Sequence, residues 1–543
     1  MRVYLLSMVL LMSSFLLEGR VIRVPSEYPT IQEGIDAANP GDTVLVAPGV
    51  YNESNITMRN GVYLLSEEGP ETTIIDCGGG EGIEIAGCDS LTVVDGFTIR
   101  NGVRAKGGGI CIWGSKALIQ NNIIEYNKGE WDPFSYGGGI AAYWHSKVTI
   151  RRNIIRYNYS YAPLGGGSGG GIAINSCDTA IIEENRIVDN VVEGEWEPGG
   201  PGQGGGIHIA ATPAIINSNI IQNNYAIAYP GYGGIGAGIF ISCGSNKRVI
   251  IINNLITGNV AQACWYDEGW GAGIYCRAPA VIVNNTIAHN YFSGLFIDTL
   301  FGHGGGIYCE NTSDTMIICN NIIAFNLADT GGGIFCSDSA RVVITYNDFF
   351  MNSNDNIYNP PPGVGEGYPY DSFYNMNYDP WFVSGPEGNY YLMRTPYWSP
   401  CVDAGSFEAC GGFEQRTTSP DGTPDAGRVD LGYHYGTAHI DVETILDVML
   451  GVKEHLYAAP HITLRCYPNP FNSKLTINYS LPAPEEATLC IYDATGRLVK
   501  RIEFQFKQTG VAIWDGNTMP DGTYFVQLKT PEYEVTKKVI LVK

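Results

Sequence analysis

Short apolar runs recur along the middle of this chain at nearly constant spacing. Runs such as residues 147–150 and 248–252 are rich in β-branched residues, and they either alternate with polar residues or are wholly apolar. They are too short for helices and are typical of strands. Each run lies between a Gly-x-Gly-Ile start and a pair of asparagines. The pattern therefore predicts many short strands joined by sharp corners.

These two landmarks are each repeated eight times. The Gly-x-Gly-Ile start begins at Gly107, Gly137, Gly169, Gly204, Gly236, Gly271, Gly304 and Gly331, in steps of 30, 32, 35, 32, 35, 33 and 27 residues. The asparagines are always five residues apart: Asn122/Asn127, Asn153/Asn158, Asn185/Asn190, Asn219/Asn224, Asn254/Asn259, Asn285/Asn290, Asn321/Asn326 and Asn347/Asn352. Self-similarity at this period is typical of a stacked-repeat architecture.

The repeat predicts a right-handed parallel β-helix solenoid, with about three strands in each coil. Leucine-rich, ankyrin and tetratricopeptide patterns are missing. Glycine at the start of each unit, and asparagine at a turn, suit corners that need left-handed backbone. Asparagines at one corner of successive coils could hydrogen-bond up the stack as a ladder. We prefer this structural explanation of the glycines and asparagines to a catalytic one.

The segment before the first repeat predicts a cap. Ile31, Ile35 and Ala38 lie at helical spacing, and Pro40-Gly41 ends the helix. An uncapped β-helix would expose its core and a strand edge. Residues 28–51 together resemble the start of pectin-lyase-like β-helix proteins, pectin methylesterases included. Residues 95–101 resemble one further coil, with a glycine in place of its first asparagine.

Past Asn352 the period is lost. Residues 379–383, 399–405 and 429–435 resemble the closing coils of bacterial surface β-helix proteins. A short amphipathic helix is expected next, with Ile445, Met449 and Val452 on one face.

The residues from His461 onward differ in charge and pattern. They hold ten Lys/Arg and eight Asp/Glu, a net charge of +2 against −25 for the remainder. Alternating runs at 475–479 and 523–528 predict a small β-sandwich. Residues 467–472, 491–496 and 514–516, with the final Lys543, resemble the C-terminal sorting domain of type IX secretion substrates. That family overlaps with immunoglobulin-like modules related to the flagellar hook-capping protein.

The resemblance implies export across an outer membrane, through the secretion machinery as a partner, followed by release or surface attachment. The start of the chain agrees, because Arg2 precedes an apolar run over residues 3–17 that resembles a secretory signal peptide. No later segment has the length and apolar character of a transmembrane anchor. We therefore predict a secreted or cell-surface protein.

The chain is expected to divide into four parts. We expect a signal peptide over 1–19, the β-helix with its helical cap and irregular closing coils over 20–439, a linker with the short helix over 440–460, and the sorting β-sandwich over 461–543. The predicted fold class is all-β.

The net charge of the chain limits the classes of molecule that it can bind. A formal charge of −23 and a pI near 4.7 argue against nucleic acid as a partner, and also against polyanionic glycans unless a divalent cation bridges them.

Cys276, Cys309 and Cys336 each follow the repeat's isoleucine by two residues, so we expect buried thiols on one inward face. Bridging of Cys77 with Cys88, or of Cys401 with Cys410, stays open.

The variable loops after each second asparagine should emerge in one column, since the coils stack. They are rich in aromatic and acidic residues, which suit stacking and hydrogen bonding to sugar rings. Beside them, the outward positions of each first strand form a second column. The candidate ligand-binding residues from these two columns are Trp265, Trp270, Tyr275, Arg277, Tyr308 and Glu310. The alternatives are that the aromatics pack the loops together, and that Arg277 and Glu310 form a surface ion pair.

Known enzymes of this fold give little support for catalysis. Of the polygalacturonase motifs only Gly302-His303-Gly304 matches, and Asn311-Thr312 lacks the following Asp. The methylesterase motifs, a pectate-lyase calcium cluster, a Ser/His/Asp arrangement and zinc-ligand spacing are not found. Whether the protein is an enzyme is left uncertain, and its catalytic residues are unknown.

No cofactor and no metal site are predicted. Asp421, Asp425 and Asp430 could ligate calcium, but we prefer an ordinary turn. The sequence thus favours a carbohydrate-binding, adhesive β-helix protein whose partner is a polysaccharide or cell-surface glycan. The alternative is a polysaccharide lyase or glycoside hydrolase with an unrecognised active site.

Overall fold

The computed structural model describes residues 19–130, 135–163, 165–194, 200–228, 233–244, 246–263, 268–294, 302–310, 315–338, 340–360, 374–406, 410–447, 463–467, 469–530 and 534–543. The chain forms two compact units, Met1–Asp441 and Val442–Lys543.

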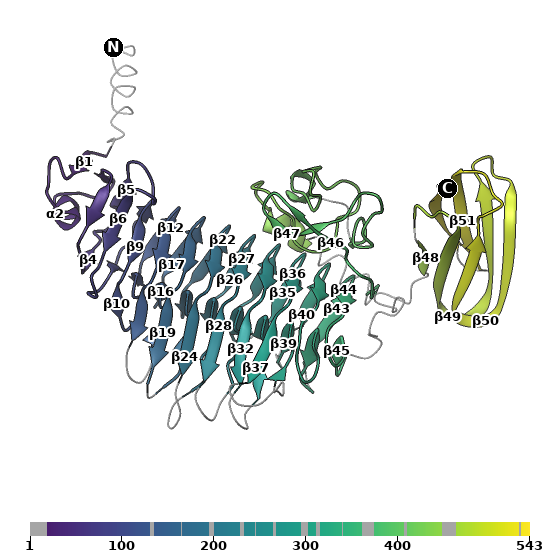
Figure 1. Ribbon diagram of the computed structural model, residues 1–543, viewed down its shortest axis with the longest axis horizontal. Helices are drawn as coiled ribbons and strands as arrows, with labels where there is room; N and C mark the ends of the chain where they lie inside the picture. The colour runs from purple at the N-terminus through teal and green to yellow at the C-terminus, as the bar shows by residue number, and fades with distance from the viewer. Residues whose placement is uncertain are drawn as a thin grey trace, which may run out of the picture. The chain divides into compact units, whose positions relative to one another are not determined.

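The first unit is a parallel β-helix, drawn in Figure 1 as a stack of arrows from purple to green. In the coil that starts at Gly107, the chain passes through β11 (Ile110–Trp113), β12 (Lys116–Gln120), β13 (Ile123–Glu125) and β14 (Lys128–Glu130). Each strand pairs in parallel with its equivalent in the next coil. The predicted fold class is confirmed. A fourth, seven-stranded sheet adds to the expected three in the middle coils.

The four sheets are named here A to D. Sheet A has twelve strands, from β1 (Val21–Val24) through β12 to β43 (Val342–Thr345), and sheet D has seven, from β10 (Val103–Arg104) to β37 (Tyr291–Gly294). Sheet C contains β4 (Ile56–Thr57), β7 (Ile83–Ala86), β11, β16 (Ile140–Tyr143), β21 (Ile172–Asn175), β25 (Ile207–Ala210), β29 (Ile239–Ser242), β34 (Ile274–Arg277), β39 (Ile307–Cys309), β42 (Ile334–Cys336) and β45 (Ile357–Tyr358). Sheet B contains β3 (Gly49–Tyr51), β6 (Thr73–Asp76), β9 (Thr98–Arg100), β13, β18 (Ile154–Arg156), β23 (Arg186–Val188), β27 (Ile220–Gln222), β31 (Leu255–Thr257), β36 (Thr286–Ala288), β41 (Ile322–Ala324) and β44 (Asp348–Phe350).

The core is built from columns of β-branched side chains in register. The isoleucine of each Gly-x-Gly-Ile start pairs with the next one up the stack, and all eight are fully buried. Cys276, Cys309 and Cys336 lie in register in the same core, as predicted. All thirteen cysteines in the described part of the chain are free thiols, including the two pairs whose bridging was left open.

Two asparagine ladders run the length of the stack, one at each corner of sheet B. Asn254 is a representative rung: its Nδ2 donates to Ile216 O at 2.8 Å and to Asn285 Oδ1 at 3.0 Å. Its Oδ1 accepts from the backbone N–H of Asn219 at 2.9 Å. The first ladder runs from Asn122 to Asn375 and the second from Asn127 to Asn356. The predicted ladder is confirmed, and it exists twice.

The left-handed backbone lies one residue earlier than the sequence indicated. The ladder asparagines of the eight repeats are not in this region, but the residue before each of them is, with φ between 49° and 66°. At the first corner these residues are Asn121, Arg152, Glu184, Ser218, Asn253, Asn284, Asn320 and Tyr346; at the second, Tyr126, Tyr157, Asp189, Asn223, Gly258, His289, Phe325 and Met351. The first glycine of each repeat start also has positive φ, as expected. Because the ladder asparagine points inward, its predecessor points away from the core.

The N-terminal cap forms as predicted. Helix α2 (Ile31–Asp36) begins at Thr30, whose hydroxyl accepts from the backbone N–H of Glu33 at 3.2 Å. Ile31, Ile35 and Ala38 are fully buried and belong to the same core cluster as the first strands of sheet A.

A closing segment, residues 374–406 and 410–441, folds back over the outer face of sheet B. It carries the hairpin β46 (Phe382–Gly385) and β47 (Gly388–Leu392), the green lobe beside the later coils in Figure 1. Corner residues hold it: Asn253 exchanges two hydrogen bonds with the backbone of His434, and Asn284 Nδ2 donates to Asp430 O. The segment covers the apolar outward side chains of sheet B, such as Leu255 and Ile322.

The second unit contains β48 (Thr463–Tyr467), β49 (Lys474–Asp493), β50 (Leu498–Asp515), β51 (Gly522–Lys529) and β52 (Glu534–Leu541), all paired antiparallel. The predicted strands 475–479 and 523–528 lie within β49 and β51. Residues 442–447 are helical and include the buried Ile445, whereas Met449 and Val452 lie outside the described residues.

Replacing the mid-stack Asn254 with Ala should destabilise the β-helix. The change leaves the buried Ile216 carbonyl and Asn219 N–H without partners, and each such group costs about 1–3 kcal/mol. Denaturant unfolding measures the loss, with the exposed Asn52→Ala as the control. Equal stability of the two variants would contradict a stabilising role for the ladder.

Asp348, fully buried under the closing segment, should make stability depend on pH. Burial raises the pKa of its carboxyl to about 7. Because an unfolded Asp ionises near pH 3.9, the unfolded state loses this proton first, so stability falls as pH rises from about 4 to about 7. In Asp348→Asn this contribution is absent. We therefore expect the melting temperature of the variant, relative to that of the wild type, to be higher at pH 8 than at pH 5. The exposed Asp329→Asn should track the wild type, and parallel curves for all three proteins would refute the prediction.

Candidate functional site

An aromatic stack runs along the outer face of sheet C. It contains one ring from each of six successive coils: His208, Phe240, Tyr275, Tyr308, Phe335 and Tyr358. Neighbouring ring centroids lie 4.9, 5.0, 5.4, 4.9 and 4.9 Å apart, with interplanar angles of 14° or less. Parallel strands in register are separated by a similar distance, so identical positions on successive strands bring the rings face to face.

The stack becomes more exposed toward the later coils. His208, Phe240 and Tyr275 are buried, Tyr308 and Phe335 are half-buried, and Tyr358 at the end is 41 % exposed. Inside the stack each ring covers the faces of its neighbours, so solvent reaches these rings mainly at their edges. Burial lowers the pKa of His208 to about 4, which keeps this imidazole neutral near pH 7.

Short strands that precede the glycine corners cover part of this stack. β33 (Gly269–Trp270) pairs with β38 (Gly302–His303), and the half-buried Trp270 packs against Tyr308 with centroids 6.4 Å apart. Ile235, in the preceding coil, joins the same apolar cluster. Trp270 is therefore brought to the predicted site, whereas Trp265 lies outside the described residues.

Tyr275, Arg277 and Glu310 form a polar cluster at the edge of the stack. The Tyr275 hydroxyl donates a hydrogen bond to Glu310 Oε2, and Arg277 Nε lies 3.9 Å from Glu310 Oε1. Burial raises the pKa of the Glu310 carboxyl above its ordinary value. Arg277 remains largely exposed, so this ion pair contributes little to stability.

His303, the residue that matched an enzyme motif, lies between two polar partners. Its Nε2 is 2.8 Å from Glu268 Oε2, and its Nδ1 is hydrogen-bonded to the Thr330 hydroxyl. Its ring also packs on Phe335, with centroids 4.8 Å apart. The outer face of sheet C thus combines two carboxylates, an imidazole and a guanidinium with an aromatic surface.

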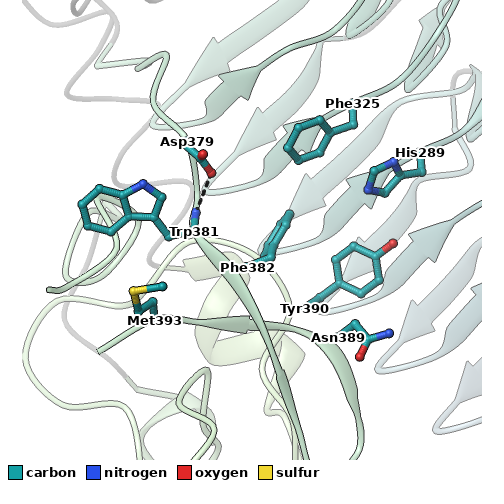
Figure 2. A pocket seen from close by; sticks show the side chains of 8 residues that line it. All are labelled: His289, Phe325, Asp379, Trp381, Phe382, Asn389, Tyr390 and Met393. Carbon is teal, nitrogen blue, oxygen red and sulfur yellow. Dashed lines mark hydrogen bonds between the residues drawn. The ribbon is translucent and has the colours of Figure 1, made fainter. Parts of the chain in front are cut away.

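A second site, which the sequence did not indicate, is a cavity of about 540 Å³ between the β-helix and the closing segment (Figure 2). His289 and Phe325 line it from the second corner of successive coils. Asp379, Trp381, Phe382, Asn389, Tyr390 and Met393 line it from the closing segment. A volume of this size is typical of small-ligand pockets.

Local backbone and packing explain how these rings reach the cavity. His289 and Phe325 are the left-handed corner residues that precede Asn290 and Asn326, so they project outward, and their rings stack 4.9 Å apart. From the other side, the Tyr390 hydroxyl is 2.6 Å from Thr257 Oγ1, and Phe382 packs edge-on against Tyr390. Burial lowers the pKa of His289, so at neutral pH its imidazole can both donate and accept a hydrogen bond.

Besides His289 and Tyr390, the cavity is lined by two exposed polar side chains, those of Asp379 and Asn389. Asp379 Oδ1 accepts from the backbone N–H of Trp381 at 2.9 Å, drawn as a dashed line in Figure 2. Asn389 Oδ1 accepts from Ser384 Oγ at 2.9 Å. The pocket therefore offers aromatic surfaces together with hydrogen-bonding groups.

Two features of the sequence could have indicated this pocket. Aromatic residues precede the second ladder asparagine in consecutive coils, at His289 and Phe325. Several outward positions of sheet B in the later coils are also apolar, such as Leu255, Ile322 and Ala324, which implies that something covers them. Residues 379–383 were recognised only as part of a closing coil.

Comparison with known families finds a match to part of each unit. Residues 50–275 match the right handed beta helix region, and residues 465–543 match the secretion system C-terminal sorting domain. No curated protein matches the sequence significantly. Within the part of the chain that the structure describes, no helix has both the length and the apolar character needed to cross a membrane. The sorting domain implies an interaction with the secretion machinery. The chain therefore contains a right-handed β-helix region and a type IX sorting domain, and it is secreted or displayed at the cell surface.

Proposed function

We propose that this secreted or cell-surface β-helix is a carbohydrate-binding, adhesive protein whose cavity between His289 and Trp381 holds a sugar residue of a glycan. The observation that carries the proposal is the composition of that cavity: aromatic side chains on both walls, with a carboxylate and an amide beside them. Sugar rings present apolar C–H faces and hydroxyl groups, so they need both kinds of contact.

The aromatic side chains are suited to this role because they are positioned before any ligand arrives. Phe325 stacks on His289, and Tyr390 is anchored through Thr257. Rigid rings give a large contact area at little entropic cost, so one or two of them can supply most of the affinity. Trp381 is 37 % exposed and available for such a contact.

The outer face of sheet C is the second proposed contact surface. It includes the sequence-predicted Trp270, Tyr275, Arg277, Tyr308 and Glu310. Here the stacked rings offer edges rather than faces, so the polar contacts of Arg277 and Glu310 would carry more of the recognition. A charge of −23 favours neutral glycans, or acidic glycans bridged by a divalent cation.

A catalytic function is the alternative, and one observation favours it. Glu310, with its raised pKa, lies in the polar cluster of the same outer face that carries the Glu268–His303 pair. A carboxyl with a raised pKa is better suited to act as a general acid toward a glycosidic oxygen, and a second carboxylate or an imidazole can act as the base.

Trp381→Ala should weaken glycan binding about tenfold or more, because a central aromatic contact is lost. Its melting temperature should stay near the wild-type value, since the side chain is partly exposed. Binding is measured by calorimetry with a glycan first identified on an array. The matched control is Trp144→Ala, which removes an exposed tryptophan directly after β16, in an earlier coil. If Trp270→Ala weakens binding while Trp381→Ala does not, the site is on sheet C instead.

The adhesive hypothesis predicts that the protein releases no product from a panel of polysaccharides, assayed for reducing ends and for unsaturated sugars. If product appears, Glu310→Gln decides the question. Loss of a catalytic acid should lower the rate about 10²-fold or more while glycan binding persists. Arg341→Gln, at a cationic position outside the cluster, serves as the control. Cleavage that depends on Glu310 would replace the adhesive function with an enzymatic one.

A further inference from the structure

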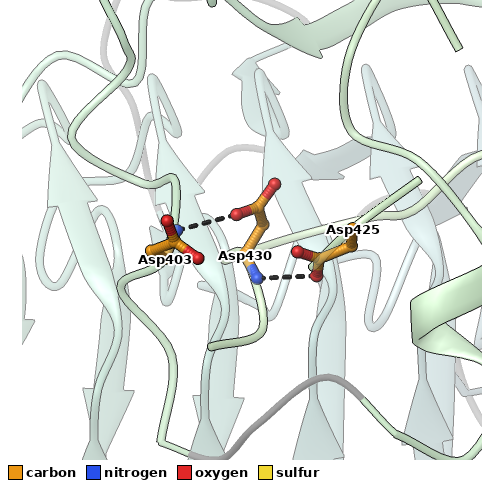
Figure 3. A group of neighbouring side chains, drawn as sticks. All are labelled: Asp403, Asp425 and Asp430. Carbon is orange, nitrogen blue, oxygen red and sulfur yellow. Dashed lines mark hydrogen bonds between the residues drawn. The ribbon is translucent and has the colours of Figure 1, made fainter. Parts of the chain in front are cut away.

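Three aspartates of the closing segment, Asp403, Asp425 and Asp430, converge beside the β-helix. One carboxylate oxygen from each lies within 4.8 Å of the others. Figure 3 shows Asp403 and Asp425 on the two sides of Asp430. Asp403 lies 22 residues before Asp425 in the chain, so only the folded closing segment brings it to the other two. We propose that they form a binding site for a divalent cation, calcium, that locks the closing segment onto the β-helix.

Hydrogen bonds inside the segment hold two of the three carboxylates in place. Asp430, fully buried, accepts from the backbone N–H of Asp403 at 2.7 Å and from Arg394 Nη2 at 2.5 Å. Asp425 Oδ2 accepts from the backbone N–H of Asp430 at 2.9 Å and lies 2.9 Å from His434 Nε2. The positions of the Asp425 and Asp430 carboxylates are therefore fixed before an ion binds.

The other oxygen of Asp425 points to a ligand. Asp425 is 2 % exposed, yet its Oδ1 has no hydrogen-bond partner among the described residues. A buried carboxylate oxygen without a partner costs more than most unsatisfied groups, because it carries charge. In Figure 3 this oxygen is on the side of Asp425 that faces Asp430. A bound cation would satisfy it.

The charge balance also favours a cation. The three carboxylates face Arg394, which is committed to Asp430, and Arg428, which donates to Gly405 O. Asp425 Oδ2 lies against His434, whereas Asp425 Oδ1 has no partner and the Asp403 carboxylate forms no ion pair with a described residue, so these groups remain for a divalent ion.

The chemistry of the donors selects the ion. All three are carboxylate oxygens, which suit hard cations rather than zinc or copper. Calcium bonds oxygen at about 2.3–2.6 Å and tolerates irregular geometry, so it can bridge oxygens separated by up to 4.8 Å. Asp403 is exposed, which leaves an entry path and room for water ligands. Extracellular calcium sites commonly have a Kd of about 10⁻⁴–10⁻³ M.

The site would couple ion binding to the fold. The backbone carbonyl of Asp430, a member of the cluster, accepts a hydrogen bond from Asn284 of the β-helix. The backbone carbonyl of the neighbouring His434 accepts one from Asn253. Arg394, which is paired with Asp430, directly follows Met393, and Met393 lines the cavity proposed to bind a glycan. An ion bound to the folded segment and not to the unfolded chain stabilises the folded state by mass action.

Thermal unfolding of the chelator-treated full chain tests the proposal, with calcium titrated to about 10 mM and potassium chloride matched for ionic strength. We expect the melting temperature to rise with calcium, and calorimetry to give one site per chain. Asp403→Asn should weaken the affinity roughly tenfold or more, because one charged ligand is lost. This variant should fold normally, since the folding contact of Asp403 is made by its backbone N–H and Asn tolerates its positive φ.

Asp421→Asn is the matched control. Asp421 lies in the same segment, but its carboxylate accepts from Ser419 Oγ and from the backbone N–H of Thr423, so it closes its own turn. This variant should respond to calcium like the wild type. The proposal is overturned if calcium does not stabilise the wild type, or if Asp403→Asn and Asp421→Asn respond to calcium as the wild type does. The second result would indicate only general screening of a chain with a charge of −23.

Discussion

The β-helix depends on a buried side-chain amide at two corners of every repeat. At these corners the chain changes direction through a residue with left-handed backbone, and neighbouring peptide groups lose their partners in the sheets. The asparagine that follows supplies both a donor and an acceptor, and it bonds to the equivalent asparagine in the next coil. Since an unpaired buried polar group costs about 1–3 kcal/mol, a slip in register would be penalised at both corners of each coil.

Fixed register has a direct consequence for the outer surface. Any side-chain type repeated at one strand position must stack along the axis, which is why six rings on sheet C meet face to face. The same rule places His289 directly over Phe325 at the second corner. The two candidate surfaces differ in what they expose. On sheet C the ring faces cover one another, whereas at the corner the closing segment leaves a cavity beside the rings.

The parts of the fold that repeat could be predicted from the sequence, because a constant offset between asparagines reflects a constant corner. Which residue has left-handed backbone could not be predicted, because the residue that makes the turn and the asparagine that makes the ladder bond are adjacent in the sequence. The outward position of Tyr275 and Tyr308 followed from strand alternation. Their covering by Ile235 and Trp270 depends on short strands that carry no repeat pattern. The pocket depends on contacts such as that of Asn253 with His434, 181 residues away, and no local pattern encodes a contact of that range.

The first ladder ends on Asn375, which belongs to the closing segment rather than to a complete coil. The chain therefore leaves the β-helix through a rung of its own ladder, and it reaches the sorting domain only after crossing the outside of sheet B. In a protein held at its C-terminal module, a pulling force enters the β-helix through this segment. The load falls first on the bonds between the closing segment and the corner asparagines, and only afterwards on the stacked sheets. The closing segment, which forms one wall of the pocket, is thus also the part of the β-helix unit that we expect to detach first under force.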